Sequence, residues 1–138
     1  MKILGFDLGS KTLGVAVSDY LEILASPVGT YYFLENDLLE ALKYAKIVIN
    51  EYKASKVVLG LPKNMDGSLG AQANYSLEFK KMLENEFKVE VIMIDERLTS
   101  KMAKQAMLQA DLTRNKQKKN IDKIAACLIL QAYLDTKK

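Results

Sequence analysis

Three acidic residues stand where a solvated carboxylate is not expected. Asp7 lies inside an apolar stretch, Glu96 directly follows the apolar run 89–94, and Asp122 precedes a pair of alanines near the start of a predicted helix. A carboxylate that is buried alone costs several kcal/mol, so it needs a partner or a cation. If the three acids converge, their repulsion raises at least one pKa unless a divalent cation lies among them. Two such cations can activate water and stabilise the leaving oxygen in phosphodiester hydrolysis.

Two of these acids also have a simpler interpretation. In the first turn of a helix, Asp122 would interact favourably with the helix dipole. Glu96 would equally form an ion pair with its neighbours Arg97 or Lys101. The sequence pattern alone leaves both interpretations open beside the metal site.

The composition narrows the chemistry that the chain can perform. Its 138 residues include no histidine and one cysteine, which excludes histidine-based triads, histidine zinc sites and an internal disulfide. Catalysis must then use carboxylates, lysine, hydroxyls or a metal, and oxygen ligands favour Mg²⁺ or Mn²⁺. With 49% apolar and 27% charged residues, we expect one globular domain over residues 1–138. The apolar runs are too short to span a bilayer and the N-terminus is no signal peptide, so we expect a cytoplasmic protein without a membrane partner.

Positive charge gathers in the last third of the chain. The net charge is +3, but residues 101–138 contain nine Lys or Arg and three acids, a balance of +6. A basic segment beside a carboxylate site suits a nucleic acid as partner. The candidates for phosphate contacts are Arg114, Lys116, Lys118 and Lys119 in a polar stretch before the last helix, with Lys11 and Arg97 near the acids. A solvated surface is the alternative for the lysines and Arg114, and a structural ion pair for Arg97.

The acids need a sheet to position them, and the chain has the patterns of one. Strands are predicted at 2–8, 13–19 and 25–33, and the short turn between the first two implies an antiparallel hairpin. Wholly apolar strands are predicted at 56–60 and 89–94, as expected where helices cover both faces of a sheet.

Helices follow and separate the last two strands. They are predicted after a cap at Asn36 or Asp37 and at 71–85, 99–109 and 121–134, with a turn at 66–67 and a polar stretch at 112–120. The order β-β-β-α-β-α-β-α-α predicts an α/β domain whose mixed five-stranded sheet joins a three-stranded antiparallel meander to two parallel strands. Ligands of such layers bind beside strand carboxyl ends, where Asp7 and Glu96 would meet. The small Ala125 and Ala126 would let the last helix approach closely.

Four sequence blocks together resemble one protein family. They are GFDLGSKTLGVAVSD at 5–19, GLPKNMDG at 60–67, DERLTS at 95–100 and IDKIAACLILQAYL at 121–134, in the order found in the YqgF (RuvX) family. The resemblance implies an RNase H-like fold and a nuclease, described for the family as processing the 5′ end of pre-16S ribosomal RNA. The matching acids are Asp7, Glu96 and Asp122. Structured RNA and ribosomal precursor particles are the partners that it implies.

Three other functions remain open. Holliday-junction resolution is the same chemistry on branched DNA, although RuvC-type resolvases carry an acid after the fourth strand, where this chain has Gly60-Leu61-Pro62. A sugar-kinase or actin-like ATPase shares the fold but needs two such lobes to enclose its nucleotide. A non-catalytic RNA-binding factor in ribosome assembly would use the basic segment equally well but gives no reason for the three acids.

Overall fold

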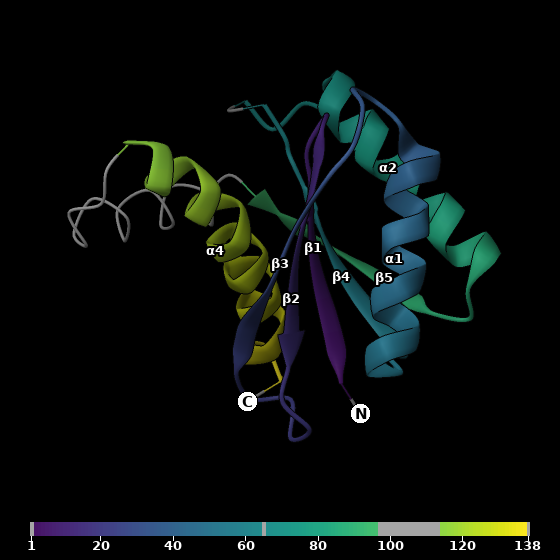
Figure 1. Cartoon of the computed structure of the whole chain (residues 1–138), viewed down its shortest axis with the longest axis vertical. Coiled ribbons are helices and arrows are strands. Elements are labelled where there is room, and N and C mark those ends of the chain that lie inside the picture. Colours follow the sequence, from purple (N-terminus) through teal and green to yellow (C-terminus); the bar gives the residue numbers. More distant parts are fainter. Residues whose placement is uncertain (1, 65, 97–113, 138) are drawn as a thin grey trace.

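A mixed five-stranded sheet with helices on both faces forms the protein, as the computed structural model shows (Figure 1). The structure describes residues 2–64, 66–96 and 114–137, the last segment with side chains from residue 124 onward. The elements are β1 (Ile3–Leu8), β2 (Thr12–Ser18), β3 (Ala25–Tyr32), α1 (Leu38–Tyr52), β4 (Lys56–Leu61), α2 (Ala71–Glu86), β5 (Glu90–Asp95) and α4 (Arg114–Asp135). The predicted α/β class and mixed sheet are confirmed. No helix in the described part of the chain has the length and apolar character needed to cross a membrane.

The strand order β3-β2-β1-β4-β5 combines antiparallel and parallel pairs. β2 pairs antiparallel with both β1 and β3, whereas β4 pairs parallel with both β1 and β5. A hydrogen bond of 2.8 Å from the Gly9 N–H to the Thr12 carbonyl closes the predicted hairpin turn. Because β1, β4 and β5 run in one direction, their carboxyl ends lie at the same edge of the sheet.

Two apolar cores lie on opposite faces of the sheet. Phe6 packs on the face covered by α1 and α2, where its ring centroid is 6.5 Å from that of Phe79. Ile3 packs with Leu130 of α4 on the other face. Because side chains alternate between the faces of a strand, Asp7 shares the α4 face with Ile3.

Helix α1 begins and ends with recognisable caps. Asp37 Oδ1 accepts a hydrogen bond of 3.1 Å from the Glu40 N–H, so Asp37 and not Asn36 is the cap. The helix ends at Tyr52, and Lys53 follows in the left-handed conformation with φ of 52°.

Helix α4 begins earlier than the sequence predicts. The expected start was near Ile121, after a polar stretch at 112–120, whereas the helix begins at Arg114. The prediction was wrong because it followed apolar periodicity, which residues 114–120 lack, although Lys, Gln and Arg have good helix propensity. Asp122 therefore lies in the third turn, and its interpretation as a first-turn dipole partner is also wrong. The helix predicted at 99–109 lies outside the described residues.

Gly5 lets α4 approach the sheet closely. A Cβ atom built on Gly5 would lie 2.6 Å from the Leu130 Cβ and 2.9 Å from the Ala126 carbonyl oxygen. Ordinary contacts between carbon atoms are about 3.5–4.0 Å, so a side chain at this position does not fit. The predicted close approach at Ala126 is therefore confirmed.

Polar contacts fix the C-terminal half of α4 to the β2–β3 hairpin. The Gln131 Oε1 accepts from the Ala25 N–H at 2.9 Å, and the Gln131 Nε2 donates to the Ile23 carbonyl at 2.8 Å. Lys137 adds an ion pair of 3.0 Å with Glu22. The rotation of the helix about its own axis is thus determined at this end.

Replacing Gly5 by alanine should lower the free energy of unfolding by about 1–3 kcal/mol, because the new methyl group must push α4 away from the sheet. Urea unfolding followed by circular dichroism measures the change. Gly29→Ala is the matched control on another strand, because no atom lies within 4 Å of a Cβ built there. Equal effects of the two substitutions would contradict the packing of α4 on Gly5.

Candidate active site

Asp7 and Glu96 meet at the carboxyl ends of the parallel strands. Asp7 lies near the end of β1 and is half-buried, whereas Glu96 directly follows β5 and is only 8% exposed. Their carboxyl groups share a hydrogen bond in which Glu96 donates and Asp7 accepts. The structure thus brings together two of the three acids singled out in the sequence, from strands that are not neighbours in the sheet.

Burial raises the pKa of both carboxyl groups. Burial, the hydrogen bond to Asp7 and the negative charges of Asp7 and Asp95 raise the pKa of Glu96 to about 10. Burial also raises the pKa of Asp7, and the hydrogen bond from Glu96 offsets part of that rise. At neutral pH Glu96 of the metal-free protein therefore keeps its proton.

Gly60 lies beneath the Glu96 side chain. It is a buried residue of β4, opposite Ile94 of β5. A Cβ atom built on Gly60 would lie 2.6 Å from the Glu96 Cγ and closer still to its carboxyl group. The sequence analysis missed this role, although a glycine directly after the apolar residues 57–59 of a strand is a signal of a close approach.

The backbone of α4 carries Asp122 toward the same end of the sheet. Ala126 contacts Gly5, and Asp122 lies one helical turn before Ala126, while Asp7 lies two residues after Gly5. The helix runs against the direction of β1 (Figure 1), and both steps advance about 6 Å toward the carboxyl ends. The Asp122 side chain lies outside the described residues. Among the side chains that are described, no group of three or more acids and cysteines could hold a metal ion.

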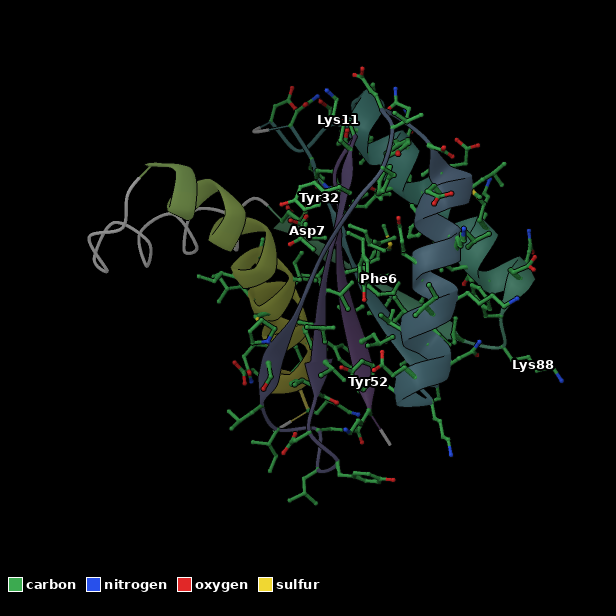
Figure 2. The ribbon with its side chains drawn as sticks, in the orientation of Figure 1. Phe6, Asp7, Lys11, Tyr32, Tyr52 and Lys88 are labelled. Atoms are coloured by element: carbon green, nitrogen blue, oxygen red, sulfur yellow. The ribbon has the colours of Figure 1, made fainter. Side chains whose placement is uncertain are left out.

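The candidate phosphate contacts are only partly described. Lys11 is exposed in the β1–β2 turn, and Figure 2 shows it beyond the end of β1 that carries Asp7. Its carbonyl accepts a hydrogen bond of 2.9 Å from the Phe33 N–H, which fixes the turn to the end of β3. Arg97 lies outside the described residues. Arg114, Lys116, Lys118 and Lys119 belong to α4, but their side chains lie outside the description.

The loop between β4 and α2 is held by its own hydrogen bonds. Asp66 Oδ1 accepts from the Ser68 N–H at 2.9 Å, and Gly67 has a φ of 89°, so the turn predicted at 66–67 is confirmed. Beyond this loop, the Gln72 Nε2 donates to the Leu8 carbonyl at 3.2 Å. The first turn of α2 is thereby attached to the strand that carries the first acid.

Comparison with known proteins gives full-length matches. The RuvX family model, described as Holliday junction resolvase, matches residues 1–136. A curated relative from Natranaerobius thermophilus is 49% identical over 137 residues, which cover 98% of this chain and 94% of the relative. A relative from Clostridium beijerinckii is 50% identical over 137 residues, covering 98% and 96%. Both carry the name "Putative pre-16S rRNA nuclease".

Two solved structures share the fold. Thermus thermophilus RuvC in complex with a Holliday junction substrate superposes with a TM-score of 0.63 at 15% identity, covering 99% of this chain and 97% of that chain. The Fowlpox virus resolvase in complex with Holliday junction DNA gives a TM-score of 0.61 at 18% identity, covering 99% of both chains. At these identities the likeness concerns the fold alone, and the predicted RNase H-like fold is confirmed.

Proposed function

Because this chain belongs to the RuvX family, we propose that it is a metal-dependent nuclease that processes the 5′ end of pre-16S ribosomal RNA. The observation that carries the proposal is the pair of half-buried Asp7 and buried Glu96, whose carboxyl groups are joined by a hydrogen bond at the carboxyl ends of parallel strands. The names of both curated relatives support ribosomal RNA as the substrate. Ribosomal precursor particles in the cytoplasm would be the place of action.

The residues at this site fit Mg²⁺ or Mn²⁺. The two hydrogen-bonded carboxyl groups offer oxygen ligands whose charges a divalent cation would neutralise, and such oxygens suit hard cations. Asp7 and Glu96 would hold the ion. The course of α4 past Gly5 supports Asp122 as the third ligand. When bound, the ion would lower the pKa of a water molecule and stabilise negative charge on the phosphate.

The chain's own groups would bind and orient the substrate. Glu96 must release its proton before it can act as a ligand, so metal binding and deprotonation are linked. Lys11, exposed beyond the end of β1, would contact a substrate phosphate. Arg97, the neighbour of Glu96, would hold the scissile phosphate by charge-assisted hydrogen bonds. The basic residues of α4 would contact the nucleic-acid backbone farther from the cut.

Cleavage assays with two substrates test the proposal. Purified protein is incubated with a pre-16S 5′-leader RNA and with a four-way DNA junction, each in Mg²⁺, Mn²⁺ or chelator. Metal-dependent cutting of the RNA is expected. Cutting of the junction alone would make the protein a resolvase, the alternative that the family description favours. Binding of RNA without cutting in either metal would instead identify a non-catalytic RNA-binding protein.

Binding to nucleic acid should weaken steeply with salt through the basic residues of α4. Replacing Arg114, Lys116, Lys118 and Lys119 together by alanine should flatten the slope of log K against log salt by up to about three units, because each phosphate contact contributes about 0.7–0.9. Alanine has the highest helix propensity, so the helix should persist. Fluorescence anisotropy with labelled RNA at several salt concentrations measures the slope.

The matched control removes four charges from the opposite face of the sheet. Exposed lysines on or next to α1 and α2 provide it: Lys43, Lys46, Lys81 and Lys88. Their replacement by alanine should leave the slope nearly unchanged. If both quadruple variants flatten the slope equally, net charge rather than a located interface governs binding.

A further inference from the structure

We propose that Gly60 is a positioning residue, which lets Glu96 reach across β4 to Asp7. The position is fixed by the sheet order, because β4 separates β1 from β5. Neighbouring strands lie about 4.8 Å apart, so the backbones that carry the two acids are about 10 Å apart. The Glu96 side chain must therefore cross the intervening strand to make its hydrogen bond with Asp7.

Only a residue without a side chain leaves this path open. Three atoms of Glu96, namely Cγ, Cδ and Oε1, occupy the space that a Cβ on residue 60 would take, with the Cγ at 2.6 Å. Each of these distances is shorter than a real contact of Cβ permits. An alanine at position 60 and the observed Glu96 conformation are therefore mutually exclusive.

The backbone itself does not require glycine at this position. Among the described glycines, Gly67 alone has a positive φ, so Gly60 adopts a conformation that any residue can take. Glycine within a strand is otherwise unfavourable because it loses the most conformational freedom on folding. Neither the strand nor its backbone conformation requires glycine at position 60. The room that the Glu96 side chain needs explains why a glycine is found there.

The expected consequence of a side chain at position 60 is local. The overlapping atoms all lie beyond the Cβ of Glu96, so rotation about its side-chain bonds can move them away while the sheet stays intact. Its carboxyl group would then leave Asp7, and the pair would no longer present its oxygens together. The metal-binding part of this inference rests on the proposed function, whereas the steric part does not.

Calorimetric titration with Mn²⁺ tests the metal-binding part. Gly60→Ala should weaken Mn²⁺ binding by about 10-fold to 100-fold, the range found when groups that orient metal ligands are replaced. Gly29→Ala is the matched control and should bind Mn²⁺ like the wild type, because a Cβ there meets no atom within 4 Å. Wild-type affinity in Gly60→Ala would overturn the proposal.

Thermal unfolding in chelator tests the steric part independently of any metal. Gly60→Ala should lower the Tm in the wild-type background by a few degrees, because it breaks the Asp7–Glu96 hydrogen bond. In a Glu96→Ala background the same substitution should leave the Tm unchanged or raise it, because the overlapping atoms are gone. Equal losses in the two backgrounds would overturn the proposal and make Gly60 a packing residue only. If the wild type binds no Mn²⁺, the proposed function fails, and these two Tm differences still decide the role of Gly60.

Discussion

Replacing Asp7 by asparagine should reduce Mg²⁺-dependent cleavage by about 10³-fold or more while the protein stays folded. Asparagine keeps the size of the side chain and one acceptor oxygen but removes the charge that holds a hard cation. The charge stabilisation that a metal gives to a transition state amounts to several kcal/mol, and each 1.36 kcal/mol is about tenfold in rate. Single-turnover cleavage of the RNA, in Mg²⁺ and in chelator, measures the loss.

The same substitution should increase the stability of the metal-free protein, although it reduces cleavage. Without metal, Asp7→Asn should unfold at a higher temperature than the wild type, because burial disfavours the Asp7 charge, whereas the asparagine is neutral and its Oδ1 can still accept the hydrogen bond from Glu96. Glu86→Gln, an exposed acid at the end of α2, is the control that should change neither cleavage nor Tm. Cleavage at the wild-type rate would refute the nuclease mechanism. A lower Tm, with no stabilisation of the wild type by Mg²⁺, would make Asp7 a structural acid.

Raising the pH from 6 to 8 should destabilise the metal-free wild type, and Glu96→Gln should remove most of this dependence. In the folded protein Glu96 keeps a proton that the unfolded chain releases near the ordinary glutamate pKa of 4.5. This stabilisation is complete below that value and is lost as the pH rises toward the folded pKa of about 10. A difference of one bound proton between the folded and unfolded states changes the free energy of unfolding by about 1.4 kcal/mol per pH unit, or about 3 kcal/mol from pH 6 to 8. The Glu96→Gln variant has no titrating group at this position, so its free energy of unfolding should change little between pH 6 and 8.

Few other groups obscure this measurement. The chain contains no histidine, and burial raises the pKa of its one cysteine, Cys127, to about 11. Scanning calorimetry in chelator at pH 6, 7 and 8 gives the slope for both proteins. Saturating Mg²⁺ should flatten the wild-type profile, because metal binding releases the proton. An equally steep profile for Glu96→Gln would show that Glu96 does not hold the proton.

Local patterns predicted the sheet and the first acid. The turn at 9–12 is too short for anything but a hairpin, and the structure confirms it with the hydrogen bond from Gly9 to Thr12. Asp7 was recognisable because an acid inside an apolar strand conflicts with its surroundings. The start of α4 was missed because the signal used for helices was an apolar stripe, and residues 114–120 form a helix without one.

The contact between the two acids could be expected only in general terms from the sequence. The strands predicted at 2–8 and 89–94 indicated that both acids reach the same edge of the sheet. The sequence did not indicate that β4 lies between them, because strand order depends on long-range packing. The need for Gly60 follows from that order alone, so a local pattern carries at most a hint of it.

The close contact between α4 and Gly5 couples the position of this helix along its axis to its rotation about that axis. A helix that slides along its axis by one residue advances about 1.5 Å and must rotate by about 100° to present a neighbouring residue to the same groove. Sliding without this rotation would bring a different side chain against Gly5, where there is no room for it. Gln131, which is hydrogen-bonded to the β2–β3 hairpin, fixes the rotation of the helix. It lies about 14 Å along the helix from residue 122. A substitution at Gln131 would therefore change the rotation of α4, and with it the position of residue 122, although no acidic residue is replaced.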